Sequence, residues 1–176
     1  MTRVRVHNLA VSLDGFATGD GQTLEAPFGH AGGRLMPWFA ATTTFRAMQG
    51  GPGGGTGIDE AFASAWAPGI GAEIMGAGMF GLHNFPDDPD WRGWWGDEPP
   101  FGCPVFVLTH KARPSLEMAG DTTFHFVDAS PTDALQRAQK VAGGKDVRIG
   151  GGPTVVRDYL KAGLVDRLHV AITPIL

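Results

Sequence analysis

The sequence contains a single cysteine, Cys103, among its 176 residues. One cysteine excludes an internal disulfide and a cysteine-rich zinc site, and it is typical of a reducing compartment. No run approaches the roughly 18 apolar residues of a membrane-spanning helix. The N-terminal segment MTRVRVHNLAVSLDG lacks the continuous apolar stretch of a signal peptide. We therefore expect a cytoplasmic protein without a membrane partner.

Positive charge is also scarce. Lys and Arg number 14 against 18 Asp and Glu, which gives a net charge of −4 and no basic surface for a nucleic-acid partner. The six histidines show no metal-ligand spacing, so no metal site is expected. Hydrophobic residues make up 43% of the chain and charged residues 18%, which is the composition of a folded protein. The length favours a single domain over residues 1–176.

Apolar runs predict the strands. Residues 4–12 begin with strict alternation, and residues 104–109 form a continuous apolar run that is typical of a strand buried on both faces. Similar but shorter signals predict strands over residues 72–75, 122–127, 146–149 and 167–173. Residues 13–33, 50–57 and 81–102 are rich in glycine, proline and short polar side chains, and we expect them to be loops.

Helices are predicted between these strands. Apolar residues at three- and four-residue steps predict helices over 35–48, 58–66 and 153–162. A further helix should start after Ser130, which can cap it, with Pro131 at the first helical position, and should end at Gly143. Alternation of strands and helices predicts an α/β protein with a largely parallel central sheet.

Two glycine clusters follow predicted strands. GAGMFG, residues 76–81, matches GxGxxG, but we expect no adequate helix after it, which argues against a Rossmann fingerprint. The second cluster, Gly150–Gly152, stands between a predicted strand and a predicted helix that opens with Pro153 and Thr154. Free amides and the helix dipole would hold a diphosphate there. The alternative is a tight turn that simply requires glycine.

Two other features allow two interpretations each. SLDG, residues 12–15, lies at the carboxyl end of the first strand, where ligands bind in open α/β sheets. Asp14 either contacts or protonates a substrate amine, or it satisfies the backbone of its own turn. Trp91, Trp94 and Trp95 either wall a flat heterocycle or cover the core under a long loop.

With SLDG, MGAGMF, VFVLTH and RIGGGPTVVRDYLKAGLVDRLHVAITPIL in view, the chain resembles the dihydrofolate reductase-like family, which includes the reductase domain of bifunctional riboflavin deaminase–reductase. The resemblance runs through nearly the whole chain and is most specific over residues 147–176. It implies a dihydrofolate reductase-like, mixed and mainly parallel sheet flanked by helices. It also implies NADPH bound in an extended cleft, and a homodimer.

The resemblance also implies roles for single residues. Val11 to Asp14 and Phe16 would border the nicotinamide and the substrate, with Trp38 on the substrate side; from that position we expect Asp14 to be catalytic. The triplet and Thr154 would hold the pyrophosphate, and the residues after the strand at 104–109 would approach the adenosine ribose. The residues implied to contact the cofactor are Val11, Gly76, Thr109, His110, Lys111, Gly150, Gly151, Gly152 and Thr154.

The chain departs from the family pattern at three places. Ala77 replaces the arginine that usually pairs with the 2′-phosphate of NADPH, so Lys111 or Arg113 compensates, or the protein accepts NADH. Residues 37–42 lack the acid that binds the pterin in dihydrofolate reductases, which disfavours folate as substrate. Relatives continue into a final hairpin after the position of Leu176, and we expect this chain to lack it.

The expected reaction is hydride transfer from NADPH, or from NADH, to a C=N bond of a small heterocycle or ribosylamine. Asp14 would polarise or protonate the imine nitrogen, and the glycine triplet would fix the diphosphate. The alternative is a non-catalytic nucleotide-binding or sensor protein on the same fold. Ala77 and the missing helix acid favour this alternative.

Overall fold

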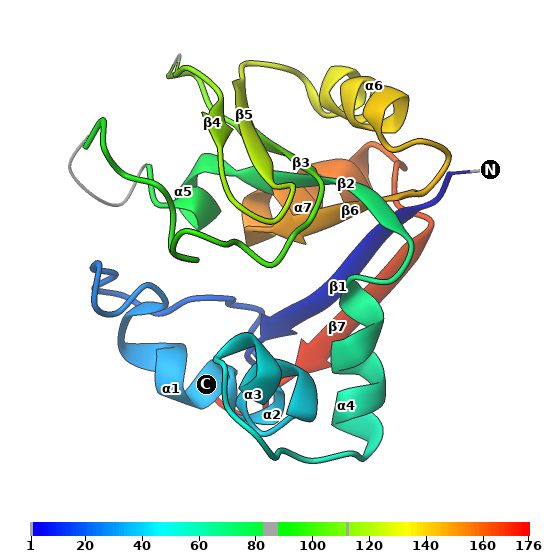
Figure 1. Cartoon of the computed structure of the whole chain (residues 1–176). Helices are drawn as coiled ribbons and strands as arrows, with labels where there is room; N and C mark the ends of the chain where they lie inside the picture. Colours follow the sequence, from blue (N-terminus) through cyan, green and yellow to red (C-terminus); the bar gives the residue numbers. More distant parts are fainter. Residues whose placement is uncertain (1, 83–87, 112) are drawn as a thin grey trace. The chain divides into compact units, whose positions relative to one another are not determined.

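The protein is described from a computed structural model, and the description covers all residues except 1, 83–87 and 112. In this part of the chain, seven strands form one sheet in the order β4-β5-β3-β2-β6-β1-β7 (Figure 1). The pairs β1–β6, β6–β2, β2–β3 and β3–β5 are parallel, and β4–β5 is antiparallel. The predicted α/β class with a mainly parallel sheet is confirmed.

Six of the strands lie where apolar runs predict them. The two-residue β4 is too short to give a sequence signal. Gly150 and Gly151 correct one expectation, because they continue β6 instead of starting a turn, and Gly151 pairs with Met75 of β2. The strands are β1 (Val4–Val11), β2 (Ile70–Gly76), β3 (Pro104–Leu108), β4 (Leu116–Glu117), β5 (Thr123–Val127), β6 (Asp146–Gly151) and β7 (Arg167–Ile172).

The single helix predicted over 35–48 is wrong. Met36 leaves the helical conformation before Pro37, which has no N–H to continue the helix. Thr42 is extended, and its hydroxyl accepts a hydrogen bond from Phe45 N as the cap of the next helix. The segment therefore contains α1 (Gly32–Leu35), α2 (Pro37–Ala40) and α3 (Thr43–Met48), after the 3₁₀ turn η1 (Gly29–Ala31).

The other predicted helices are confirmed. Ser130 caps α6 by accepting a hydrogen bond from Asp133 N, as its position predicts. A single helical turn follows Gly76, so no long helix opens after the first glycine cluster. These helices are α4 (Ile58–Ala63) with the 3₁₀ turn η2 (Ser64–Trp66), α5 (Ala77–Phe80), α6 (Pro131–Val141) and α7 (Pro153–Lys161). No helix in the described ranges is long and apolar enough to cross a membrane.

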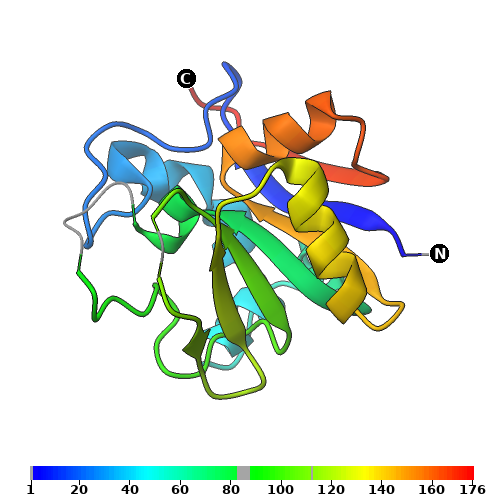
Figure 2. The ribbon, with the colours of Figure 1, turned by 90° about the horizontal axis from the view of Figure 1, so that it is seen from above.

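The chain divides into two compact units. Unit 1 comprises Met1–Val6 and Gly69–Leu168, and unit 2 comprises His7–Pro68 and His169–Leu176. Within unit 1, α6 packs on β2, β3 and β6, and α7 packs on β6 and β2; seen from above, α6 lies over these strands (Figure 2).

The core of unit 1 forms around Phe80, the last residue of α5. Its ring meets Phe124 at 5.0 Å and Phe126 at 5.1 Å between ring centroids, both edge-on. Trp91 and Trp94 donate their indole N–H groups to the carbonyls of Phe80 (2.7 Å) and Met79 (2.8 Å). The structure therefore supports the second interpretation of the tryptophans, that they cover the core. The buried cluster consists of Met75, Ala77, Phe80, Leu82, Val105, Val107 and Phe124.

Candidate functional site

Four glycines lie together at the carboxyl ends of two neighbouring strands. Gly76 ends β2, Gly150 and Gly151 end β6, and Gly152 follows them, with Met75 and Gly151 paired across the two strands. We call these four residues the glycine edge. A helix begins directly after each strand, with Gly76 as the N-cap of α5 and Gly152 as the N-cap of α7. This is the edge at which open α/β sheets bind ligands.

At three positions of the glycine edge, an added side chain would meet a neighbouring side chain. A Cβ at Gly76 would lie 2.9 Å from Val155 Cγ2, and one at Gly151 would lie 3.1 Å from Met79 Sδ. A Cβ at Gly150 would collide with Glu73 Oε1. The peptide bond between Gly151 and Gly152 is cis. Side chains of Val155, Met79 and Glu73 therefore occupy the space that a Cβ at these three glycines would need.

Gly152 differs from the other three glycines. No heavy atom lies within 4 Å of the position that a Cβ would take there. This open space adjoins the N-terminus of α7, where Thr154 is exposed in the first turn. Unpaired first-turn amides and the positive end of the dipole favour an anion at such a place. The donor set fits a diphosphate, and the first interpretation of the triplet is the one that this geometry favours.

The residues after β3 share this edge of the sheet. Leu108, the last residue of β3, pairs with Gly76, so Thr109 lies one residue beyond the glycine edge. Thr109 is buried and accepts a hydrogen bond from Lys111 N on its hydroxyl (3.0 Å). His110 is exposed, and its Nδ1 lies 3.0 Å from Asp128 Oδ1. The structure thus brings all the cofactor residues expected in unit 1 to one edge.

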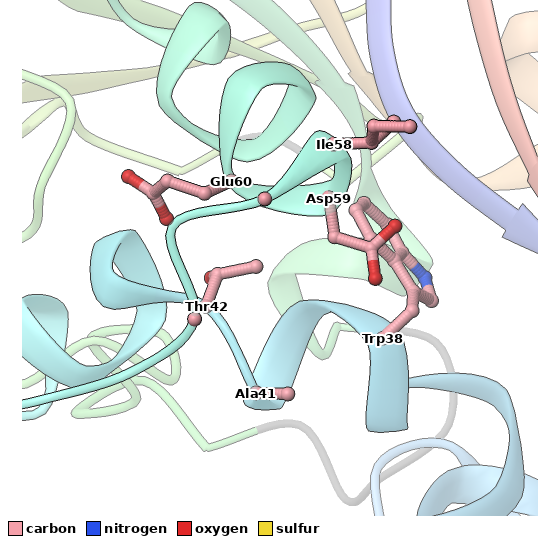
Figure 3. A pocket seen from close by; sticks show the side chains of 8 residues that line it. Trp38, Ala41, Thr42, Ile58, Asp59 and Glu60 are labelled. Atoms are coloured by element: carbon pink, nitrogen blue, oxygen red, sulfur yellow. The ribbon is translucent and has the colours of Figure 1, made fainter.

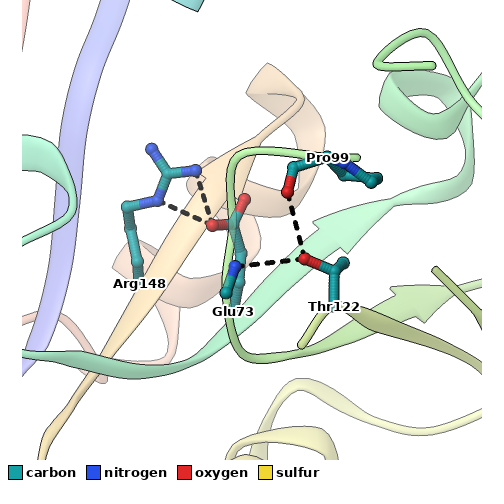
Figure 4. Close-up of polar contacts among 5 residues, drawn as sticks. Glu73, Pro99, Thr122 and Arg148 are labelled. Carbon is teal, nitrogen blue, oxygen red and sulfur yellow. Dashed lines mark hydrogen bonds and ion pairs between the residues drawn. The ribbon is translucent and has the colours of Figure 1, made fainter. Parts of the chain in front are cut away.

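A buried ion pair that the sequence analysis missed lies beside Gly150. Arg148 donates from Nε (2.8 Å) and Nη2 (2.5 Å) to Glu73 Oε2 (Figure 4). Glu73 is 1% exposed and Arg148 is 7% exposed. Burial raises the pKa of Glu73, and the charge of Arg148 opposes that rise. The sequence indicates this ion pair only through one charged residue in each of two otherwise apolar runs, AEIM at residues 72–75 and VRI at residues 147–149.

Arg113, the second basic candidate, already makes contacts with the loop before it and with a ring of β5. Its Nη2 donates to the carbonyls of Pro89 (2.7 Å) and Trp91 (2.9 Å), and its guanidinium lies 5.0 Å from the centroid of Phe126. These contacts hold the loop that contains Trp91, Trp94 and Trp95, here called the tryptophan loop, against the core of unit 1. Ala77 is 2% exposed within that core. Compensation for the missing arginine by Lys111 or Arg113 stays a prediction.

Asp14 lies in a closed turn of unit 2. Its Oδ1 accepts a 2.5 Å hydrogen bond from the hydroxyl of Ser12, and that hydroxyl accepts from Phe16 N (3.0 Å). Asp14 and Phe16 are both exposed. Val11 ends β1, and its carbonyl accepts from Thr173 N (2.8 Å). This geometry is that of a turn aspartate, and a catalytic role for Asp14 stays a prediction.

Trp38 lines a cavity of about 240 Å³ within unit 2 (Figure 3). Glu60 is already engaged, because it accepts hydrogen bonds from the amide (2.9 Å) and hydroxyl (2.8 Å) of Thr44. The Asp59 side chain points toward Trp38, and its carboxylate has no protein partner in the described ranges. The lining residues are Trp38, Ala41, Thr42, Gly55, Gly57, Ile58, Asp59 and Glu60.

An aromatic cluster that was not expected adjoins Trp38 in unit 2. The His169 ring stacks on Phe62 at 4.4 Å between centroids, and the Trp38 ring meets it edge-on at 6.0 Å. His169 Nδ1 accepts a hydrogen bond from the backbone of Asn8 (3.3 Å), a residue with a φ of 65°. Burial lowers the pKa of His169, which favours the neutral ring. In the described residues, no group of three or more metal-binding side chains occurs.

The chain matches the family described as RibD C-terminal domain over residues 4–176. No curated protein matches it. The match to this family indicates a reductase-type domain of riboflavin biosynthesis. Members of the family generally bind NADPH. The mainly parallel sheet with flanking helices agrees with its dihydrofolate reductase-like fold. The fold and the family match agree with the sequence resemblance, and the chain belongs to the family of the C-terminal reductase domain of riboflavin deaminase–reductase.

Proposed function

We propose that the protein is a nicotinamide-dinucleotide-dependent reductase that transfers a hydride to a C=N bond of a small heterocycle or ribosylamine. The observation that carries the proposal is the open space at Gly152, at the N-terminus of α7 and beside Gly76. A strand end lined by glycine and followed by a helix is suited to a dinucleotide diphosphate.

The residues of unit 1 would bind and orient the dinucleotide. The amides at Gly152 and in the first turn of α7 would donate to the diphosphate, with the Thr154 hydroxyl beside them. Gly76 lets the backbone come close, and Thr109–Lys111 would border the adenosine ribose. A bound reduced nicotinamide supplies the hydride, and the protein contributes position and dry surroundings.

The residues of unit 2 would bind the substrate. A flat ring can stack on the Trp38 indole, and an N–H of that ring can donate to the Asp59 carboxylate. When hydride reaches the imine carbon, the nitrogen must gain a proton. We assign that step to Asp14, directly or through water, because Asp14 is exposed in the turn that follows β1. Asp14→Asn should then lower kcat, and unchanged turnover would exclude the role.

The preference for NADPH over NADH should be smaller than in relatives that carry the arginine. Ala77 offers no charge, and Arg113 is engaged with Pro89 and Trp91. Loss of one charge-assisted phosphate contact weakens binding by about 1.5–3 kcal/mol. We therefore propose NADPH as the cofactor, with Lys111 near its 2′-phosphate and with NADH accepted less tightly.

The test is a titration of tryptophan fluorescence with NADPH and, separately, with NADH. The wild-type chain should bind NADPH, and Gly152→Ala should weaken binding about 100-fold, because a methyl group fills the space over two or more amide donors. Gly33→Ala is the matched control, since its new Cβ also meets no atom within 4 Å but lies in α1. Failure of the wild type to bind either dinucleotide would contradict the proposal. Binding without turnover of any imine substrate would favour the non-catalytic alternative.

A further inference from the structure

The cavity at Trp38 in unit 2 is lined by charge of one sign. Asp59 and Glu60 both contribute to its wall, and no lysine, arginine or histidine of the described residues lines it. Its volume of about 240 Å³ lies below the roughly 300–1,000 Å³ of pockets for drug-sized ligands, so a ligand that fits is small. The lining therefore favours a small ligand that carries positive charge.

Asp59 is the carboxylate that a ligand can reach. It is exposed, it makes no hydrogen bond or ion pair with the described residues, and its side chain points toward Trp38 (Figure 3). Glu60 differs, because the amide and the hydroxyl of Thr44 occupy its two oxygens at 2.9 Å and 2.8 Å. Both of these donors are neutral, so the charge of Glu60 adds to that of Asp59.

The side-chain donors of the wall are used or covered. The Thr42 hydroxyl donates to the carbonyl of Phe39 (2.7 Å) and accepts a hydrogen bond from Phe45 N (3.1 Å). The indole nitrogen of Trp38 is buried from solvent. The side chain that remains for a ligand is Asp59, which can only accept hydrogen bonds. A ligand of this cavity therefore has to bring the donors.

Trp38 supplies a second attraction for a cation. The face of an indole ring carries partial negative charge and attracts a cation within about 6 Å of its centre. Because Asp59 points toward Trp38, a cation that pairs with Asp59 also lies beside the indole. A neutral ring would gain only the packing on Trp38, and an anion would be repelled by both carboxylates.

We propose that the cavity at Trp38 binds a small organic cation, which is a protonated amine or an amidinium group on an apolar or aromatic body. Asp59 pairs with the cation, Trp38 packs against its body, and the charge of Glu60 strengthens the attraction. The inference deepens the proposed function and rests on it, since it names the substrate as cationic at the end that enters the cavity. Asp59 then selects against neutral and anionic analogues of the substrate.

The experiment titrates the full chain with three probes of nearly equal size, which are benzylammonium, benzyl alcohol and benzoate. The readout is the Kd from shifts of the ¹⁵N–¹H amide peaks of residues 41–42 and 55–60. Benzylammonium should bind about fivefold more tightly than benzyl alcohol, and benzoate should bind more weakly than both. Added salt should weaken the binding of benzylammonium and leave that of benzyl alcohol unchanged, because ions screen charge.

Asp59→Asn should weaken the binding of benzylammonium about fivefold and change that of benzyl alcohol less than about 1.5-fold. Asparagine keeps the shape of the side chain, so a loss confined to the charged probe separates the charge effect from a structural one. Asp20→Asn is the charge-matched control, because Asp20 is also exposed in unit 2 but does not line the cavity. Its Kd for benzylammonium should stay within about 1.5-fold of wild type.

Three results would overturn the inference: equal affinity for benzylammonium and benzyl alcohol, tighter binding of benzoate, or wild-type affinity in Asp59→Asn. The absence of shifts at the cavity with benzylammonium would overturn it as well. These titrations contain no dinucleotide, so they are independent of the NADPH titration that tests the proposed function. A chain that binds NADPH without this charge preference contradicts the inference alone. A chain that binds benzylammonium but neither dinucleotide contradicts the proposed function, and with it the substrate role of the cation.

Discussion

Gly150→Ala is expected to lower the free energy of unfolding by about 3 kcal/mol, as overpacking of a rigid buried site does. The added methyl group would overlap Glu73 Oε1, and Glu73 cannot swing away easily because two nitrogens of Arg148 hold it. Moving the carboxylate would strain a buried ion pair. Urea denaturation followed by tryptophan fluorescence measures the change.

Gly152→Ala provides the control for this variant. It adds the same methyl group two residues away, where no heavy atom lies within 4 Å and φ is −73°. We expect the free energy of unfolding to change by less than about 0.5 kcal/mol. A Gly150→Ala variant as stable as Gly152→Ala would mean that Glu73 does not lie against the triplet.

Phe80→Ala should destabilise the protein by about 4 kcal/mol, the usual cost of removing a fully buried phenylalanine. The Phe80 ring is 0% exposed and packs edge-on against Phe124 and Phe126. Its carbonyl also accepts the indole N–H of Trp91, so the tryptophan loop depends on the same turn of α5. Thermal and urea unfolding of the variant give the magnitude.

Phe16→Ala is the matched control, because the Phe16 side chain is 64% exposed. Its stability should stay within about 0.5 kcal/mol of wild type. A cost below about 1 kcal/mol for Phe80→Ala would contradict the packing described for unit 1. Near-ultraviolet circular dichroism should also change only for Phe80→Ala, since Trp95 lies 6.4 Å from the Phe80 ring.

The sheet was predictable because its strands carry short apolar runs. Helix α6 was predictable because a serine followed by a proline, here Ser130 and Pro131, is typical of a helix N-terminus. The prediction over residues 35–48 was wrong because the apolar spacing there is that of one helix, whereas Pro37 and Thr42 each begin a new short helix. Gly150 and Gly151 looked like a turn because glycine has low strand propensity, yet pairing with neighbouring strands keeps them extended.

The glycine edge could be foreseen for a topological reason. Gly76 and the triplet each follow a predicted strand, and parallel strands bring their carboxyl ends to one edge. The contact of Glu73 with Gly150 depends on register, which no local pattern reveals. The cavity at Trp38 likewise depends on how α2 and α4 pack, and Asp59 carried no signal of its own.

The measurement that tests dinucleotide binding at the glycine edge most directly is the ¹⁵N–¹H amide spectrum of the full chain, with and without NADPH. We expect the largest shifts within unit 1 at Gly76, at Thr109–Lys111, and from Gly150 to Val155, except at Pro153, which has no amide proton. The same peaks should stay in place for Gly152→Ala at equal NADPH. Shifts confined to residues outside these segments, or no shifts at saturating NADPH, would contradict the account.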